Sequence, residues 1–324
     1  MTDSQKGTLA GFTGNFIFGL SFLFSTRAFS AAKAALAGTG ARAGADVPVV
    51  LAVRFVFAFL LMSALIPLLK IKLSFKGKPV YKLVLIGIFQ PVIYFICESF
   101  GLQMTGIVVS SVMIALVPVL CQILSAVFLK EIPNAKQVLC CVLSVAGVAA
   151  AAFFSGDGGQ TYLVGILVLG IAVLAAGGFN VLSRGVSEVF TPFERTYFMF
   201  VVSAVFFTGY ALVSVRFQPL LIVKPLADPS FLISILYLGG LSSVVAYFFI
   251  NYANTYLPLT RSAVFSNIIT VVSTAAGFLS GERFNLYTLL ACVLIVAGVW
   301  GVQHFAYVES GAAVPQSTPG LGKK

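Results

Sequence analysis

The sequence contains ten apolar stretches, each close to the length that an α-helix needs to cross a bilayer. A helix of about 20 residues spans the ~30 Å hydrocarbon core. Only helices and closed barrels satisfy their backbone hydrogen bonds there, and no alternating strand pattern competes in this chain. The stretches lie near residues 9–33, 48–69, 81–103, 107–129, 137–154, 162–183, 193–215, 230–255, 259–280 and 286–307. We therefore predict an all-α integral membrane protein with ten transmembrane helices.

Composition supports a membrane protein. Hydrophobic residues make up 59% of the chain and charged residues only 9%, against roughly 25% charged in an ordinary soluble domain. The net charge of +10 does not indicate nucleic-acid binding, because the basic residues stand singly or in the loops between spans. The asymmetry of loop charge that orients membrane proteins explains them better.

The composition of reactive residues argues against an enzyme. All five cysteines lie in apolar stretches, and the chain has one histidine and no CxxC pair. We find neither a nucleophile with a base nor a glycine-rich phosphate loop. The sequence therefore predicts no metal, no cofactor and no catalytic site.

One ten-residue segment occurs twice, at a spacing of 151 residues. Residues 139–148 read LCCVLSVAGV and residues 290–299 read LACVLIVAGV, and the same offset pairs Glu131 with Glu282 and Ser111 with Ser262. A period this long indicates duplicated halves rather than a solenoid. We place the first five-helix repeat at 9–155 and the second at 156–307, between a cytoplasmic N-terminus (1–8) and a disordered cytoplasmic tail (308–324).

An odd number of spans in each repeat makes the two halves inverted with respect to the membrane, which is the plan of many secondary transporters. Loop charge gives the orientation, because positively charged loops stay in the cytoplasm. With the N-terminus inside, thirteen basic residues lie on the inner side and five on the outer side. The inner set is Lys6, Lys70, Lys72, Lys76, Lys78, Lys82, Lys130, Lys136, Arg184, Arg195, Arg261, Lys323 and Lys324, and the outer set is Lys33, Arg42, Arg216, Lys224 and Arg283. We expect a multi-pass protein of the cytoplasmic (inner) membrane with both termini in the cytoplasm.

The order of these features resembles the drug/metabolite transporter superfamily, specifically the EamA type. The similarity includes VPVVLAVRFVFAFLL in the second span, YFICESFGLQMTGIVVSSVMIALVPVL through the third and fourth, FLKE after the fourth and VAGV in the fifth. The pattern then repeats in the last three spans. The resemblance implies a ten-helix carrier or exporter with a central cavity and alternating access. Such proteins often have a tryptophan in the first span, where this sequence reads NFIFGLSFLF.

Ionisable residues inside the spans are the first candidates for function, because they are costly in hydrocarbon unless they are paired or face water. Glu98, in FICESFG of the third span, could contact a cationic group of the substrate or take up a coupling proton. The alternative is a fixed ion pair with Arg27 of the first span or Arg54 of the second. Arg54 could instead neutralise a substrate anion or bond to backbone carbonyls.

Polar residues at equivalent places in the two halves are the second set of candidates. Asn15 and Asn180 lie in the equivalent first and sixth spans, and Tyr94 and Tyr247 in the equivalent third and eighth. Symmetry-related polar groups suit a substrate site near the membrane midplane, and hydrogen bonds between helices are the alternative role. The predicted substrate-binding residues are Asn15, Gln90, Tyr94, Glu98, Asn180, Tyr247 and Asn251.

These observations predict a secondary active transporter that exports small polar or amphipathic metabolites, such as amino acids or related compounds, across the cytoplasmic membrane. The alternative is a flippase for lipids or lipid intermediates with the same fold. The expected partners are a small-molecule substrate, the bilayer and a coupling proton, with no nucleic acid. GFLSG at 277–281 has the GxxxG spacing that packs helices closely, either within the fold or in a homodimer.

Overall fold

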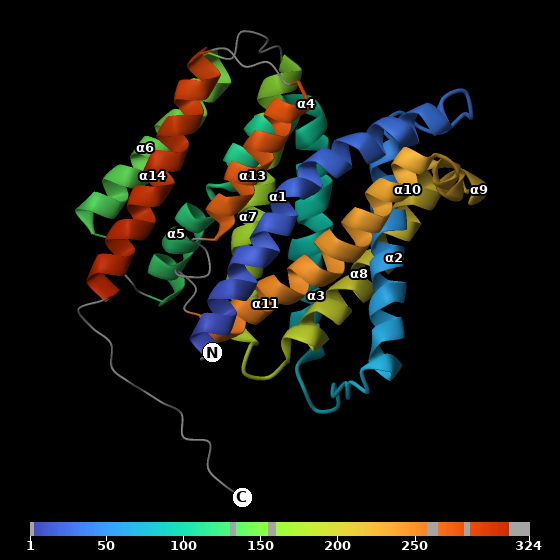
Figure 1. Ribbon diagram of the computed structural model, residues 1–324, viewed down its shortest axis with the longest axis horizontal. Coiled ribbons are helices and arrows are strands. Elements are labelled where there is room, and N and C mark those ends of the chain that lie inside the picture. Colours follow the sequence, from blue (N-terminus) through green and yellow to red (C-terminus); the bar gives the residue numbers. More distant parts are fainter. Residues whose placement is uncertain (1–2, 130–133, 155–159, 258–264, 282–285, 311–324) are drawn as a thin grey trace, which may run out of the picture.

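The computed structural model describes residues 3–129, 134–154, 160–257, 265–281 and 286–310, and within these ranges it contains helices and no strand (Figure 1). The helices of the first half are α1 (Asp3–Leu36), α2 (Asp46–Leu68), α3 (Val80–Gly87), η1 (Ile88–Ile93), α4 (Tyr94–Ile114), α5 (Val117–Leu129) and α6 (Ala135–Phe154). Those of the second half are α7 (Gln160–Gly185), α8 (Pro192–Ser214), α9 (Leu220–Val223), η2 (Lys224–Ala227), α10 (Pro229–Ile235), η3 (Leu236–Val245), α11 (Ala246–Tyr256), α13 (Ser266–Leu279) and α14 (Leu286–Ser310). The predicted all-helical fold is confirmed.

Among the residues that the structure describes, six helical segments are long and apolar enough to cross a membrane. They are Gln5–Leu36, Asp46–Leu68, Val80–Ile114, Tyr162–Gly185, Pro192–Ser214 and Pro229–Tyr256. The expected fifth, ninth and tenth spans correspond to α6, α13 and α14, and the expected fourth covers the end of α4 and all of α5. The number ten remains a prediction for these four. The expected tail at 1–8 is helical from Asp3, and the tail at 308–324 lies outside the described residues from 311 onward.

Two helix breaks lie in the region of the expected third and fourth spans, one at Gly106 and one at residues 115–116. Gly106 has φ 83° and ψ 175°, a conformation open only to glycine, and it forms the tight turn expected between the third and fourth spans. The fourth span, expected as one helix over 107–129, is interrupted at Ala115 and Leu116 and resumes as α5. Pro118 lies in the first turn of α5, where the missing N–H of proline has no cost.

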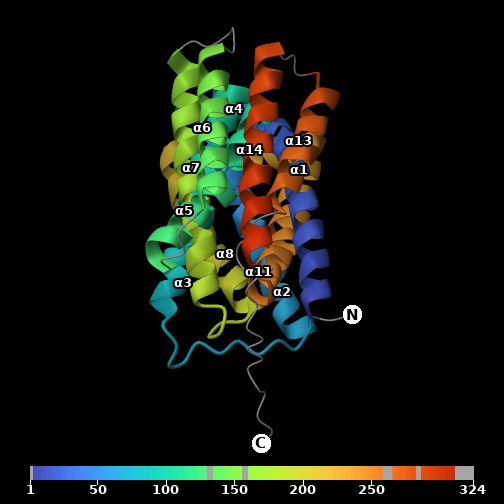
Figure 2. The same cartoon turned by 90° about the vertical axis from the view of Figure 1, so that its left-hand side faces the viewer.

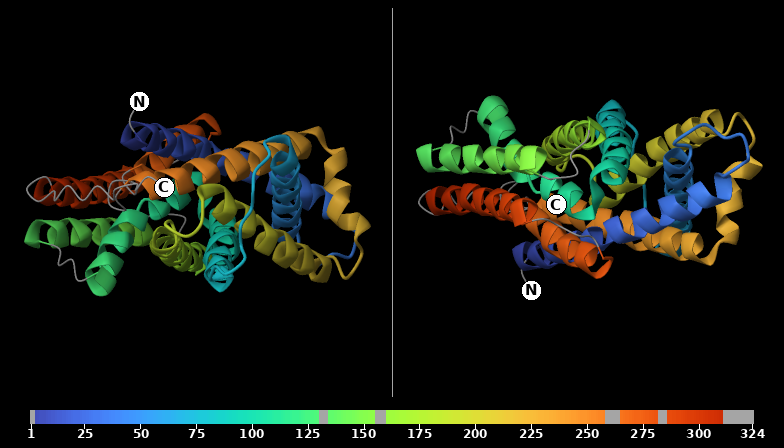
Figure 3. Two further views of the ribbon diagram at one scale, coloured as in Figure 1. Left: turned by 90° about the horizontal axis from the view of Figure 1, so that it is seen from below. Right: turned by 90° about the horizontal axis from the view of Figure 1, so that it is seen from above.

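The two halves pack against each other in equivalent pairs. The first helix of one half packs on the third helix of the other: α1 packs on α10, η3 and α11, and α7 packs on α4. In addition, α2 packs on α8, and α6 packs on α14. Exchanging the halves leaves this set of pairs unchanged. Figure 3 shows α6 and α14 side by side at one end of the elongated bundle. In Figure 2 this end of the bundle faces the viewer. The first helix of the bundle, α1, begins at the same end of the bundle at which α14 stops (Figure 1). We call this end of the bundle the termini end.

The repeated segment lies at this pairing. Ser144 Oγ is 3.5 Å from the carbonyl oxygen of Ile295, and these two residues hold the same position in the two copies of the segment. Gly298 lies directly against the backbone of α6 at Cys140, so a larger residue would force the helices apart. Equivalent residues meet in this way only near a two-fold axis, as expected for inverted repeats.

Candidate functional site

The third helix of each half widens into a π-helical segment immediately before its tyrosine. η1 ends one residue before Tyr94, and η3 ends two residues before Tyr247. Within η1, Gln90 has extended backbone angles, φ −147° and ψ 119°, next to Pro91. π-Helical segments are rare and often mark functional sites, and transporters build midplane sites from interrupted helices. The two interruptions therefore make the surroundings of these tyrosines the candidate site.

A cavity lies between the halves at this level, with an empty volume of about 570 Å³ when the solvent at its mouth is included. Half of its wall is polar and half apolar, and none of the residues in the wall is charged. The polar residues are Asn15, Gln90, Tyr94, Asn180, Tyr247, Asn254 and Ser266, and the apolar ones are Phe18, Ile114, Val117, Ala176, Phe179, Ile250 and Ile269. Such a wall suits an uncharged or zwitterionic molecule with an apolar part.

Asn15 and Asn180 each make an equivalent hydrogen bond within their own half of the protein. Asn15 Nδ2 donates to the Gly11 carbonyl (2.7 Å), and Asn180 Nδ2 donates to the Ala176 carbonyl (2.9 Å), each one turn back along its helix. This bond engages the amide nitrogen and leaves the amide oxygen available as an acceptor. Asn254 Nδ2 donates to the oxygen of Asn180 (3.2 Å). The structure thus brings the predicted pair into one wall.

Gln90 and Tyr247 join the two equivalent third helices across the cavity. Gln90 Nε2 donates to Tyr247 Oη (2.6 Å). Both side chains are buried, and a hydrogen bond between them satisfies polar atoms that would otherwise be costly in an apolar interior. Movement of one half against the other would change this contact directly.

An aromatic layer around Tyr247 borders the cavity. Tyr247 lies against Phe18 (5.5 Å between ring centroids), Phe95 (6.3 Å) and Phe200 (6.1 Å), all at steep interplanar angles. On the other side, Asn180 and Asn254 are near the C-terminal ends of α7 and α11. The cavity therefore lies in the part of the bundle toward the termini end, with the aromatic layer as its floor.

Two predicted residues do not line this cavity. Glu98 lies one helical turn beyond Tyr94, behind the aromatic layer, with 1% of its surface exposed. Asn251 is fully buried between helices: its amide nitrogen donates to Thr196 Oγ1 (2.9 Å) and its amide oxygen accepts from Ser183 Oγ (2.9 Å). Packing rotates α11 so that Asn254, three residues later, faces the cavity instead.

The ion pair considered as the alternative role of Glu98 is not formed. Arg27 is exposed, and its guanidinium carbon lies 6.0 Å from the Phe24 ring centroid, so Arg27 is not the partner of Glu98. Arg54 is buried and donates to Ser243 Oγ (3.0 Å) and Ser242 Oγ (3.2 Å) of η3. Among the described side chains, no nitrogen of Arg54 is within 4.0 Å of a Glu98 oxygen.

Arg195 is a buried cation that the sequence analysis treated only as a loop charge. Its guanidinium donates to the Ser183 carbonyl (2.9 Å), Ser183 Oγ (2.7 Å), the Asn251 carbonyl (2.9 Å) and Thr255 Oγ1. These bonds tie α8 to α7 and α11. They also place a positive charge at the C-terminal end of α11, where the helix dipole favours it.

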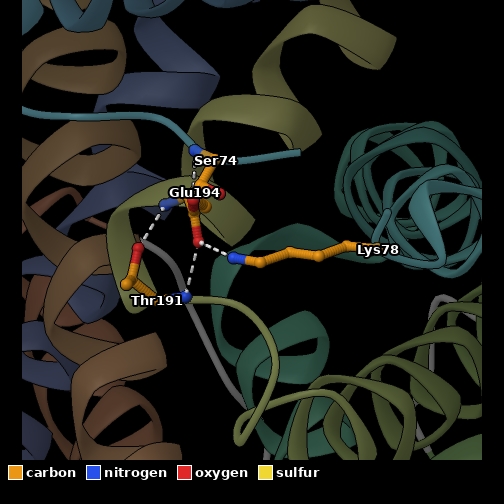
Figure 4. Close-up of polar contacts among 4 residues, drawn as sticks. All are labelled: Ser74, Lys78, Thr191 and Glu194. Atoms are coloured by element: carbon orange, nitrogen blue, oxygen red, sulfur yellow. Dashed lines mark hydrogen bonds and ion pairs between the residues drawn. The ribbon is translucent and has the colours of Figure 1, made fainter. Parts of the chain in front are cut away.

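Glu194 joins the two halves at the termini end (Figure 4). Its Oε2 accepts from Thr191 N (2.9 Å) in a capping box that starts α8, and its Oε1 accepts from Ser74 N (2.8 Å). Ser74 belongs to residues 69–79, the connection between α2 and α3, which we call the strap. The sequence signal was present in TPFE, a threonine followed three residues later by glutamate.

Replacing Glu194 by alanine is expected to lower the free energy of unfolding by about 2 kcal/mol. The variant loses a capping interaction worth about 1 kcal/mol and leaves Ser74 N without its acceptor, a cost of similar size. Lys78→Ala is the matched control, because its 3.5 Å ion pair with Glu194 is partly exposed and should contribute at most about 1 kcal/mol. Thermal unfolding in detergent measures both, and equal losses would show that the ion pair, rather than the two backbone contacts, holds the strap.

A multi-pass helical bundle with a half-polar cavity between two equivalent halves is the architecture of a membrane transporter. The chain belongs to the EamA-like transporter family, whose model matches residues 5–153 and again 163–303. Among the described residues, no group of three or more His, Cys, Asp or Glu side chains could hold a metal ion.

Curated relatives carry the same general description. The chain is 31% identical to the uncharacterized transporter YcxC of Bacillus subtilis over 300 residues, covering 90% of this chain and 91% of the relative. It is 25% identical to an uncharacterized transporter of Archaeoglobus fulgidus over 76% of this chain and 85% of that protein. A solved crystal structure matches with a TM-score of 0.63 at 19% identity, over 97% of this chain and 99% of the other, which supports the fold alone.

Proposed function

We propose that this protein is a secondary transporter that exports small uncharged or zwitterionic amphipathic metabolites, such as amino acids or related compounds, by alternating access. The observation that carries the proposal is the wall of the cavity: seven polar and seven apolar residues, none of them charged, drawn from both halves. Amides and hydroxyls of this kind can both donate and accept hydrogen bonds. They suit the polar end of a metabolite, and the apolar residues suit its side chain.

The position of the cavity and the loop charge support export as the proposed direction of transport. The cavity lies toward the termini end, and we propose that this end faces the cytoplasm of a cell whose inner membrane the protein spans. A substrate loaded from the cytoplasm is the first step of export. The aromatic layer between the cavity and the opposite end would have to part for release.

Thermal stability of the purified protein in detergent, measured against a panel of ligands, tests the substrate class. A ligand at 100 times its Kd stabilises the folded protein by about 2.7 kcal/mol. We expect amino acids or uncharged bases to raise the melting temperature, and polyamines and sugar phosphates to leave it unchanged, since the wall offers no charge to pair with them. Stabilisation by polyamines or sugar phosphates alone would contradict the proposal.

Glu98→Gln is the companion variant in this experiment. Because Glu98 lies behind the aromatic layer and outside the wall, we expect the variant to keep the same ligand-induced shift. Loss of the shift in Glu98→Gln, with normal melting in the absence of ligand, would instead place this carboxylate in the substrate site.

A lipid or lipid-intermediate flippase is the second candidate, supported by a groove between α1 and α11. The groove is mainly apolar and has one basic residue; it is lined by Lys6, Leu9, Ala10, Thr13, Phe248, Phe249 and Tyr252. An acyl chain with an acidic headgroup would fit such a surface. A short-chain anionic phospholipid in the same panel distinguishes the two functions: stabilisation by this lipid and by no metabolite would favour the flippase.

A further inference from the structure

Glu98 is a buried acid whose surroundings provide little for a negative charge. Only 1% of its surface is exposed, and its Oε2 has no hydrogen-bond partner in the part of the chain that the structure describes. The neighbouring Ser99 Oγ is likewise buried without a partner there. A carboxylate oxygen without a donor is unfavourable in an apolar interior, whereas a protonated carboxyl is much less so. The surroundings of Glu98 therefore suit the protonated acid.

Arg54 lies close to Glu98 but is engaged elsewhere. Its charged group donates to the hydroxyls of Ser242 and Ser243 and lies 4.3 Å from the centroid of the Phe95 ring. Arg54 and Glu98 are near enough to interact electrostatically, although they form no ion pair. Opposite charges attract strongly in a medium of low dielectric constant, so a charged Glu98 would compete with the two neutral hydroxyls for Arg54.

The two serines lie in the helical segment that leads to the cavity of the proposed transport cycle. Ser242 and Ser243 lie in η3, the π-helical segment that leads directly into Tyr247 of the cavity. Gly239 of η3 lies against the carbonyl oxygen of Arg54, since a Cβ there would be 3.0 Å from it. η3 and α2 are therefore in close contact at Arg54, and a shift of its side chain changes what holds η3 in place.

We propose that Glu98 is a proton-binding site that controls η3 through Arg54. With the proton bound, Arg54 holds Ser242 and Ser243. When Glu98 releases its proton to water, the resulting carboxylate draws the guanidinium into an ion pair, the two hydrogen bonds to the serines break, and η3 is freed. The inference rests on the proposed function and names its coupling ion.

The other titratable groups around this pair are tyrosines. Tyr94 of α4 and Tyr247 of α11 are near enough to Glu98, and Tyr237 of η3 to Arg54, to interact with them electrostatically. The hydroxyls of two of them are occupied: Tyr247 accepts from Gln90, and Tyr237 donates to the Ile17 carbonyl (2.8 Å). None of the three can supply the positive charge that a carboxylate at Glu98 needs, and Arg54 can.

Hydrogen exchange of residues 236–245, followed by mass spectrometry in detergent at pH 5.5 and pH 8.5 and corrected for the intrinsic effect of pH, tests the proposal. In the wild type we expect exchange to be at least about fivefold faster at pH 8.5, the lower end of typical couplings between sites. In Glu98→Gln exchange should be slow at both pH values, because the amide cannot ionise. In Glu98→Asp the pH dependence should return.

Two further variants keep the test decisive if Glu98→Gln does not fold. Ser99→Ala removes the adjacent hydroxyl but no charge, and should behave as the wild type. Replacing Ser242 and Ser243 together by alanine removes the contacts of Arg54 with η3, so exchange should be fast at both pH values. A wild type without pH dependence would overturn the proposal, as would pH dependence that persists in Glu98→Gln or in the double serine variant. No substrate is needed, so the result does not depend on the outcome of the ligand panel.

Discussion

Replacing Arg195 by methionine is expected to lower the free energy of unfolding by about 3–5 kcal/mol. The guanidinium donates to four acceptors on α7 and α11, and each buried acceptor left without a donor costs about 1–3 kcal/mol. The four costs do not add fully, because hydrogen bonds within membranes are individually modest and neighbouring groups rearrange. Methionine keeps most of the apolar volume, so the loss reports the hydrogen bonds. Thermal or denaturant-induced unfolding in detergent measures it.

Arg184→Ala provides the matched control for Arg195. Arg184 also donates to the C-terminal end of α11, to the carbonyls of Asn254 (3.0 Å) and Thr255 (2.9 Å), but it is exposed. Water can replace its bonds, so we expect a loss of only about 0.3–1 kcal/mol, the usual effect of a cation at a helix end. Equal losses in the two variants would mean that the charge at the helix end matters and that the buried network does not.

The sequence was sufficient for the fold because hydropathy and length leave few alternatives inside a bilayer. The duplicated segment at 139–148 and 290–299 also predicted the symmetry, and its two copies meet in the structure at Ser144 and Ile295. The same symmetry pointed to Asn15 with Asn180 and to Tyr94 with Tyr247, and all four lie in the cavity wall. Whether they bind substrate remains a prediction.

The rotation of a helix about its own axis was not predictable from the sequence. Asn251 and Asn254 are three residues apart in α11, and only Asn254 reaches the cavity. Their directions depend on η3, whose π-helical turns shift every later residue relative to a regular α-helix. Arg195 was missed for a related reason: a cation in the first turn of a span normally reaches the membrane surface, whereas here α7 and α11 enclose it.

Narrowing the cavity at Ala176 is expected to abolish most ligand binding without loss of the fold. Ala176 is a small residue of the wall, contributed by α7, and Ala176→Leu would extend a branched side chain into the space between Asn180 and Tyr247. A 100-fold increase in Kd would reduce the stabilisation by a ligand at 100 times the wild-type Kd from about 2.7 to about 0.4 kcal/mol. The melting temperature with and without a ligand identified in the panel measures this change.

Gly170→Leu is the matched control, because it adds a larger side chain to the same helix where no atom lies within 4 Å of the added Cβ. It should keep the full ligand-induced shift. The melting temperature without ligand must be compared first, since overpacking at Ala176 can itself cost about 1–3 kcal/mol. If Ala176→Leu melts within that range and still gives the full shift, the ligand binds elsewhere, and the groove between α1 and α11 becomes the next place to look. If only Ala176→Leu loses the shift, the space between the two halves is where the transported molecule binds.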